Sequence, residues 1–354
     1  MFRFYRNCPA IVSLVGHNAE KSPQKRDLRN VCVRDRKFSA ITLKDIGEFK
    51  LYTLMKKFKA ALTAALFATF LSMTVSAACD ESKKNEFALF NPAKGVWFTN
   101  SADGCAFTAV KWGLATDKLV PADYDGDGEL DAAVYRPENG TWYIRRSIDS
   151  KAEILVLQGN KLLGDVPVPA DYDGDRIADI AVWRAATGEW IVRNSSKAKN
   201  RIAINLGVTG DIPVPADYDG DGRADNAVFR PSENRWIIQQ SSDNRIRTEV
   251  FGTAGKDTLV PADYTGDGKA DIAVYFAGKW NVINSETGEK ETFEFGFKDD
   301  IAAPADYDCD GTVDFAVYRK GTWYIHESGK PKFRQFDFGG ENDIPLAAAA
   351  TRKS

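Results

Sequence analysis

Residues 121–131 read PADYDGDGELD, and this stretch decides the fold of the chain. Positions 1, 3, 5 and 9 of a short loop are aspartates: Asp123, Asp125, Asp127 and Asp131. Alternate residues of a tight loop can aim their oxygens at one point, and calcium takes six to eight hard oxygen ligands at about 2.3–2.6 Å. Gly128, at position 6, permits the sharp turn because glycine adopts positive φ without steric cost. The spacing predicts a calcium loop; the alternative is an acidic, solvated surface turn.

The same stretch recurs four more times along the chain. The copies are PADYDGDRIAD at 169–179, PADYDGDGRAD at 215–225, PADYTGDGKAD at 261–271 and PADYDCDGTVD at 304–314. Their ligand order matches the first nine residues of an EF-hand loop. Five copies, 43 to 48 residues apart, exclude a chance turn for the set. A period of this length indicates a solenoid, a propeller or an array.

Each repeat unit predicts four short β-strands. In the unit that begins at Val166, VPVPAD forms the first strand, and DIAVWR, WIVRNS and RIAINLG form the next three after the acidic loop. Short strands with turn signals about every ten residues indicate an all-β fold. Four strands in about 45 residues correspond to one blade of a propeller.

Repeated features count six blades. A third-strand tryptophan occurs six times, at Trp97, Trp142, Trp190, Trp236, Trp280 and Trp323. The segment NEFALFNPAKGVWF matches strands two and three, and DIPLAAAA matches strand one. We therefore predict a six-bladed propeller in which strand 343–348 pairs with the strand near 86–90 and completes a shared blade. The repeated aromatic side chains are expected to pack blade on blade, with ligand stacking as the alternative.

The charge balance excludes a polyanion as the general partner. Lys plus Arg is 47 and Asp plus Glu is 50 in 354 residues, of which 44% are hydrophobic. We therefore predict no nucleic-acid binding. The acidic residues concentrate in the five loops, which suits a small cation.

Residues 55–78 are predicted to be a secretory signal peptide. Met55 and the following lysines form a positive segment, an apolar run begins at Ala60, and small residues end it. An uncleaved membrane anchor is the alternative, because the run approaches a spanning length. We expect cleavage and a secreted, periplasmic or cell-surface protein without stable membrane insertion.

The remaining boundaries follow from this signal. Residues 1–54 are interpreted as an upstream extension from an early start codon, with a cytoplasmic segment before an anchor as the alternative. Residues 79–348 form the propeller and 349–354 a tail. In an exported protein Cys79 and Cys105 can form a disulfide, and lipid attachment at Cys79 is a further alternative.

The repeat resembles the FG-GAP/VCBS repeat. The unit D-x-D-x-D-G-x-x-D, followed by (I/A)AVYRP and G-x-W, carries the resemblance over about residues 85 to 346. That repeat builds the head of integrin α subunits and many exported bacterial proteins, including adhesive and lectin-like ones. The resemblance implies calcium in the loops between strands one and two, and it leaves the ligand open.

The implied calcium ligands are the side chains at positions 1, 3, 5 and 9 and the backbone carbonyl at position 7. They are Asp123, Asp125, Asp127, Glu129 and Asp131; Asp171, Asp173, Asp175, Ile177 and Asp179; Asp217, Asp219, Asp221, Arg223 and Asp225; Asp263, Asp267, Lys269 and Asp271; and Asp306, Asp308, Asp310, Thr312 and Asp314. Three loops depart from the pattern: Arg176 replaces the glycine, Thr265 replaces a carboxylate, and Cys309 stands at position 4. Up to five sites are expected, the weakest in the loop of Thr265.

Three functions fit the sequence: a binding module for a protein or glycan, a propeller enzyme acting on glycans, and a structural scaffold. Binding is favoured by an arginine after the second-strand aromatic, at Arg136, Arg184, Arg230 and Arg319. These guanidinium groups could meet carboxylates or sugar hydroxyls; the alternative is that each covers a Trp or pairs with an acid. An enzyme is disfavoured because residues 79–354 contain one histidine, His326, and no catalytic set can be assembled. We expect a monomer.

Overall fold

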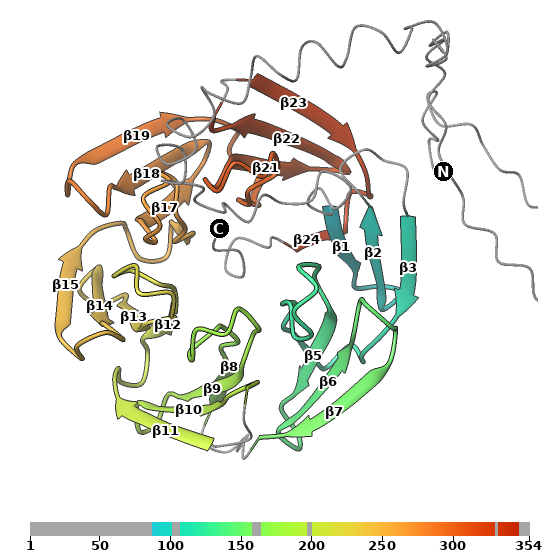
Figure 1. The fold of residues 1–354 in the computed structure, drawn as a ribbon. Helices are drawn as coiled ribbons and strands as arrows, with labels where there is room; N and C mark the ends of the chain where they lie inside the picture. The colour runs from blue at the N-terminus through green and yellow to red at the C-terminus, as the bar shows by residue number, and fades with distance from the viewer. Residues whose placement is uncertain (1–86, 101–106, 158–163, 197–199, 330–331, 347–354) are drawn as a thin grey trace, which may run out of the picture. The chain divides into compact units, whose positions relative to one another are not determined.

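In the computed structural model, the described residues are 87–100, 107–157, 164–196, 200–329 and 332–346. Every regular element in these ranges is a β-strand, and the strands form six four-stranded antiparallel sheets. The sheets are the blades of a ring, with the first strand of each nearest the centre and the fourth at the periphery (Figure 1). The predicted all-β, six-bladed propeller is confirmed. The predictions for residues 1–86, the tail, and the Cys79–Cys105 disulfide lie outside the described residues.

Blades 1 to 3 follow one another along the chain. Blade 1 contains β4 (Lys118–Leu119), β5 (Ala132–Arg136), β6 (Thr141–Arg145) and β7 (Ala152–Val156). Blade 2 contains β8 (Asp165–Pro167), β9 (Ile180–Arg184), β10 (Glu189–Arg193) and β11 (Asn200–Asn205). Blade 3 contains β12 (Ile212–Pro213), β13 (Asn226–Arg230), β14 (Arg235–Gln239) and β15 (Ile246–Val250).

Blades 4 to 6 complete the ring. Blade 4 contains β16 (Thr258–Leu259), β17 (Ile272–Phe276), β18 (Lys279–Ile283) and β19 (Lys290–Glu294). Blade 5 contains β20 (Ile301–Ala302), β21 (Phe315–Arg319), β22 (Thr322–Glu327) and β23 (Lys332–Asp337). Blade 6 contains β24 (Ile344–Leu346), β1 (Phe87–Asn91), β2 (Val96–Asn100) and β3 (Phe107–Lys111).

Blade 6 joins strands from both ends of the described chain. β24 pairs antiparallel with β1, with Ala88 opposite Leu346 and Phe90 opposite Ile344. The Asn91 amide also donates a hydrogen bond to Asp343, 252 residues away. This is the strand pairing expected from the sequence for 343–348 and 86–90.

The apolar core lies between consecutive blades. The six third-strand tryptophans are 0–3% exposed, which confirms their packing role. Six hydrophobic clusters each combine residues of two neighbouring blades. In one of them, Trp183 and Trp190 of blade 2 pack with Val228 of blade 3. In another, Tyr318 and Trp323 of blade 5 pack with Phe87 of blade 6. Burial of this apolar surface therefore holds the blades to each other.

Each blade presents two different ends. In blades 1 to 5 the acidic loop connects the first strand to the second, and a bridge such as Ala122 with Asp131 closes its base. The second strand then runs to a hairpin turn at the opposite end of the blade. We name the end with the five acidic loops the loop rim, and the end with the hairpin turns the turn rim.

Candidate functional site

The tyrosine at position 2 anchors every acidic loop. Its hydroxyl donates to the carbonyl four residues earlier, as Tyr172 does to Val168 at 2.9 Å, and its backbone N–H donates to the position-9 carboxylate. The same pair of bonds occurs at Tyr124, Tyr218, Tyr264 and Tyr307. The sequence shows this residue five times in PADY, yet the sequence analysis assigned it no role. Its function is to fix the position-9 aspartate at the base of the loop.

Three of the four predicted aspartate side chains converge in each of four loops, and the groups leave out Asp131, Asp175, Asp221 and Asp310. Three carboxylates in each of these loops bring one oxygen apiece within 4.8 Å of one another. The groups are Asp123, Asp125 and Asp127; Asp171, Asp173 and Asp179; Asp217, Asp219 and Asp225; and Asp306, Asp308 and Asp314. Hard carboxylate oxygens at this separation fit Ca²⁺. Within the described ranges, the loop of Thr265 forms no such group, and Thr265 instead donates to Asp271 at 3.4 Å.

A serine five residues after the third-strand tryptophan completes each loop. Its backbone N–H donates to the position-9 aspartate in all five loops, at 2.6–2.7 Å. In four loops its hydroxyl also donates to the position-5 aspartate, as Ser147 does to Asp127 at 2.8 Å. These serines were not predicted as site residues, although their spacing five residues after the tryptophan is visible in the sequence: Ser147, Ser195, Ser241, Ser285 and Ser328. Blade 6 has no acidic loop and has Ala102 at that spacing.

Burial raises the pKa of the position-9 carboxyls well above the ordinary value of an aspartate. The pKa rises to about 7 at Asp131, Asp225 and Asp314, and to about 6 at Asp179 and Asp271. Nearby carboxylates raise it further, against the backbone donors that lower it. A bound cation would favour the charged form of every group in the loop, because it supplies the missing positive charge.

Consecutive loops contact one another around the loop rim. The position-1 carbonyl accepts a hydrogen bond from the position-8 N–H of the next loop, as Asp123 does from Ala178 at 2.7 Å. A side chain at position 4 would meet the position-7 side chain of the next loop: a Cβ added at Gly126 would lie 3.1 Å from Ile177. The fifth loop has no following acidic loop, and there Cys309 occupies position 4 with φ 63°. Arg176, at the glycine position 6 of the second loop, keeps the left-handed turn with φ 70°.

The third loop contains an internal cation. The guanidinium of Arg223 donates to Asp221 at 3.0 and 2.6 Å, so one predicted ligand is already paired within its own loop. Beside the first loop, Arg146, which follows β6, lies 3.6 Å from Asp125. These arginines compete with a metal ion for the same carboxylates.

On the turn rim, the four predicted arginines form bidentate ion pairs. Each donates through Nε and Nη2 to the aspartate 19 residues earlier: Arg136 to Asp117, Arg184 to Asp165, Arg230 to Asp211, and Arg319 to Asp300. The aspartate side chains are only 0–2% exposed. The guanidinium groups therefore neutralise buried carboxylates, and ligand binding by them as a set stays a prediction. Arg319 alone of the four also borders the cavity described next.

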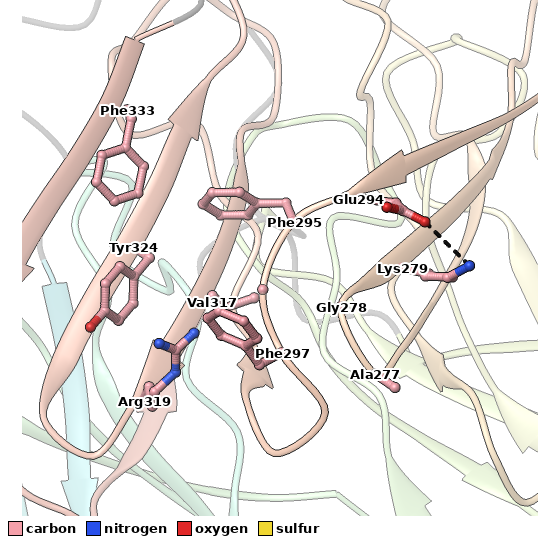
Figure 2. Close-up of a pocket in the computed structure, with 11 residues that line it drawn as sticks. Ala277, Gly278, Lys279, Glu294, Phe295, Phe297, Val317, Arg319, Tyr324 and Phe333 are labelled. Carbon is pink, nitrogen blue, oxygen red and sulfur yellow. Dashed lines mark ion pairs between the residues drawn. The ribbon is translucent and has the colours of Figure 1, made fainter.

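A cavity of about 450 Å³ opens on the turn rim between blades 4 and 5. Blade 4 contributes its hairpin turn and the segment after β19, and blade 5 contributes side chains of β21, β22 and β23 (Figure 2). Phe295, Phe297, Tyr324 and Phe333 supply aromatic walls, and Arg319 lies between Tyr324 and Phe297. His326 lies behind this wall, with its ring 4.8 Å from Phe293 and 6.0 Å from Phe295.

The blades and their loops define a class: a β-propeller with acidic loops between the first and second strands. The model of the FG-GAP-like repeat matches residues 217–274, from the third acidic loop to β17. The other acidic loops occupy the same place in their blades. Residues 217–274 therefore contain an FG-GAP-like repeat, and the six-bladed fold with the four other acidic loops supports an FG-GAP repeat propeller.

Solved structures show the same fold at low sequence identity. TolB from Acinetobacter baumannii superposes with a TM-score of 0.53 at 14% identity, covering 76% of this chain and 68% of TolB. A lectin of Agrocybe aegerita that recognises non-reducing terminal N-acetylglucosamine superposes with a TM-score of 0.51 at 14% identity, covering 76% and 86%. No curated protein matches the sequence. In the described part of the chain, no helix is long and apolar enough to span a membrane.

Proposed function

We propose that this protein is an exported, calcium-binding propeller that acts as a binding module for a protein or glycan. The observation that carries the proposal is the convergence of three carboxylates in each of four loops on a single rim. Calcium bound there would tie each loop to its blade and, through the loop-to-loop hydrogen bonds, to the next blade. A rigid rim lowers the entropic cost of holding a partner.

The binding role draws support from the turn rim. A cavity with aromatic walls and a few polar groups is the usual form of a small-molecule site. The Agrocybe aegerita lectin shows that a propeller of similar fold recognises a sugar. A purely structural scaffold is the second candidate, and the ion pairing of the four turn-rim arginines favours it. Catalysis is not part of the proposal.

Titration of calcium into protein freed of metal by a chelator tests the proposed calcium binding. We expect several sites with Kd on the order of 10⁻⁴–10⁻³ M, typical of extracellular modules. Magnesium is the matched control, because it demands a smaller octahedral site. Calorimetry that detects no calcium binding in metal-free, folded protein would refute the metal part.

A glycan array and a capture experiment with extracellular proteins test the binding part. Both are run in calcium and in chelator, at a temperature where the chelated protein is still folded. A ligand in either assay supports a binding module. Calcium binding without any ligand in either assay favours the scaffold.

Export is tested separately. The secreted form is expected to begin at Ala78 or Cys79, after the signal segment at 55–78. Sequencing the N-terminus of the exported product checks this. A stable product that retains residues 1–54 would contradict it.

A further inference from the structure

Blades 4 and 5 differ from the other blades in the hairpin turn between the second and third strands. Their turns have two residues, 277–278 and 320–321, whereas the other blades have four, at 137–140, 185–188, 231–234 and 92–95. Both residues of each short turn have positive φ, for example 50° at Ala277 and 85° at Gly278. This is the geometry of a type I′ turn. The turn rim therefore has less backbone at the boundary between blades 4 and 5 than at the boundaries between blades with four-residue turns.

The longer turns contact the segment that follows the fourth strand. In blade 3 the Asn234 side chain accepts a hydrogen bond from the Ala254 N–H at 2.7 Å. In blade 2 the Ala185 carbonyl accepts one from the Thr209 hydroxyl at 3.1 Å. In blade 4 the corresponding segment begins at Phe297, and the short turn 277–278 forms a wall of the cavity beside it. The cavity thus lies where the hairpin turn of blade 4 is two residues shorter than the turns of blades 1, 2, 3 and 6.

Aromatic rings line this cavity in a fixed arrangement. The Phe297 carbonyl accepts from the Tyr275 hydroxyl at 3.0 Å and its N–H donates to Asp300 at 2.8 Å, so its backbone is held on both sides. The Phe297 ring itself is 66% exposed. Opposite it, the Tyr324 and Phe333 rings stack with centroids 6.2 Å apart. The cavity therefore offers ring faces already in place before any ligand arrives.

Arg319 supplies a directed donor between these rings. Its guanidinium carbon lies 4.3 Å from the Phe297 centroid and 4.6 Å from the Tyr324 centroid. Nε and Nη2 bind Asp300, which fixes the plane of the group. In blades 1 and 2 the third nitrogen donates to Tyr143 and Glu189, respectively. Among the described residues, Nη1 of Arg319 has neither a hydroxyl nor a carboxylate partner, and it remains available to a ligand.

The charges of the cavity are balanced. Arg319 is paired with Asp300, and Lys279 is paired with Glu294 at 3.2 Å at the mouth (Figure 2). A carboxylate or phosphate ligand would therefore meet no excess positive charge. A ligand with an apolar face for the rings and hydroxyl oxygens for Nη1 complements the site better. The hexopyranose ring has both features, with C–H bonds on its faces and hydroxyl groups on its edge.

We infer that the cavity between blades 4 and 5 binds a neutral pyranose. The pyranose face lies against the part of the Phe297 ring that the Arg319 guanidinium leaves uncovered, and a sugar hydroxyl oxygen accepts a hydrogen bond from Arg319 Nη1. The cavity volume lies within the range of roughly 300–1,000 Å³ that is usual for small-ligand sites. This inference rests on the proposed binding function and assigns it one site and one ligand class.

The test uses the mature protein and free sugars. Glucose, galactose, mannose and N-acetylglucosamine are titrated by saturation-transfer NMR and calorimetry, with glucuronic acid as the charged comparison. Phe297→Ala removes a ring face and is expected to weaken binding about tenfold. Val208→Ala is the matched control, because Val208 follows the fourth-strand glycine of blade 2, is 53% exposed and donates to Asp211 as Phe297 does to Asp300. Replacing residues 277–278 by the four residues found at 137–140 should cover the cavity and abolish binding.

The outcomes separate this inference from the proposed function. Binding of at least one neutral sugar that Phe297→Ala weakens and Val208→Ala retains supports the inference, provided that both variants melt like the parent. Equal affinity in the parent, Phe297→Ala and the lengthened turn places the sugar site elsewhere and overturns the inference, while the binding function stands. Preference for glucuronic acid, or binding of none of the sugars, also overturns it. The proposed function then depends on the protein-capture and calcium experiments.

Discussion

On the loop rim, aspartates gather with one another, whereas on the turn rim four aspartates each meet a guanidinium from their own blade. The loop-rim carboxylates accept hydrogen bonds mainly from backbone amides and serine hydroxyls, as Asp131 does from Tyr124 and Ser147. On the turn rim, Asp165 is 1% exposed and bound by Arg184. The fold therefore supplies an internal cation to four buried carboxylates of the turn rim, whereas the clustered carboxylates of the loop rim fit the calcium binding that we propose.

Removing calcium should lower the stability of the fold more than any other change, and it should act only on the loop rim. At about 2 mM calcium and a Kd of about 10⁻⁴ M, each site stabilises the fold by roughly 1.8 kcal/mol. Chelation should therefore lower the melting temperature strongly. Asp125→Asn keeps the shape of the side chain and removes one charge, so it should lower the melting temperature in calcium and have little effect in chelator. Equal melting temperatures of metal-free and calcium-loaded protein would show that the loop rim does not depend on calcium.

The pH dependence of the metal-free protein should come next in size. The pKa values of the position-9 carboxyls lie near 6 to 7 in the folded protein, above the unfolded value of 3.8. The stability that these groups contribute is present below about pH 4 and is lost as the pH rises through 6 to 7. In chelator, thermal melts at pH 5 should therefore show higher stability than melts at pH 7.5. Calcium should reduce or reverse this trend. A melting temperature in chelator that rises between pH 5 and 7.5 would contradict the assignment.

Breaking one turn-rim ion pair should have a smaller effect, which calcium does not change. Arg184→Met leaves the buried Asp165 without its cation and should cost about 2–3 kcal/mol, less than a fully buried pair because Arg184 is 14% exposed. Lys279→Met is the control, since its pair with Glu294 is exposed on both sides and should contribute less than about 1 kcal/mol. Denaturant unfolding in calcium and in chelator measures both. A similar cost for the two variants would mean that burial does not distinguish these pairs.

The smallest expected effect concerns backbone strain on each rim. Arg176→Gly and Ala277→Gly both relieve a positive φ at a residue with a Cβ, and each should gain about 0.5–1 kcal/mol. The first change also removes a positive charge beside the second loop and should strengthen calcium binding there. Its gain should therefore be larger in calcium than in chelator, whereas the gain from Ala277→Gly should be the same in both. An equal gain in stability in calcium and in chelator for Arg176→Gly would show that calcium does not distinguish the two rims at this position.

Repeats made most of the fold predictable from the sequence. The number of blades followed from the six tryptophans, and the acidic loops lie where the spacing placed them. The partners of the arginines were visible too, because Asp117, Asp165, Asp211 and Asp300 each precede their arginine by 19 residues. Without that spacing, the four arginines were predicted to form one ligand site.

The cavity could not be predicted in this way. It depends on which side chains of two blades face each other, and Phe297 and Tyr324 are far apart in the repeat pattern. The short turns were present in the sequence as YFAGKW and YRKGTW, against YRPENGTW in blade 1. Their effect on the turn rim becomes apparent only when neighbouring blades are placed together, because repeat periodicity describes what the blades share.

The pairing of β24 with β1 also determines when the ring can close during synthesis of the chain. Among the described strands, β24 is the last that a ribosome releases, and its partner β1 is the first. Throughout synthesis the inner edge of β1 therefore has exposed backbone donors and acceptors that no later strand has yet covered. The ring can close only after the chain has been extended through Leu346. The nascent protein thus remains an open chain of blades until Leu346 has been added, a period when edge pairing with other chains competes with closure.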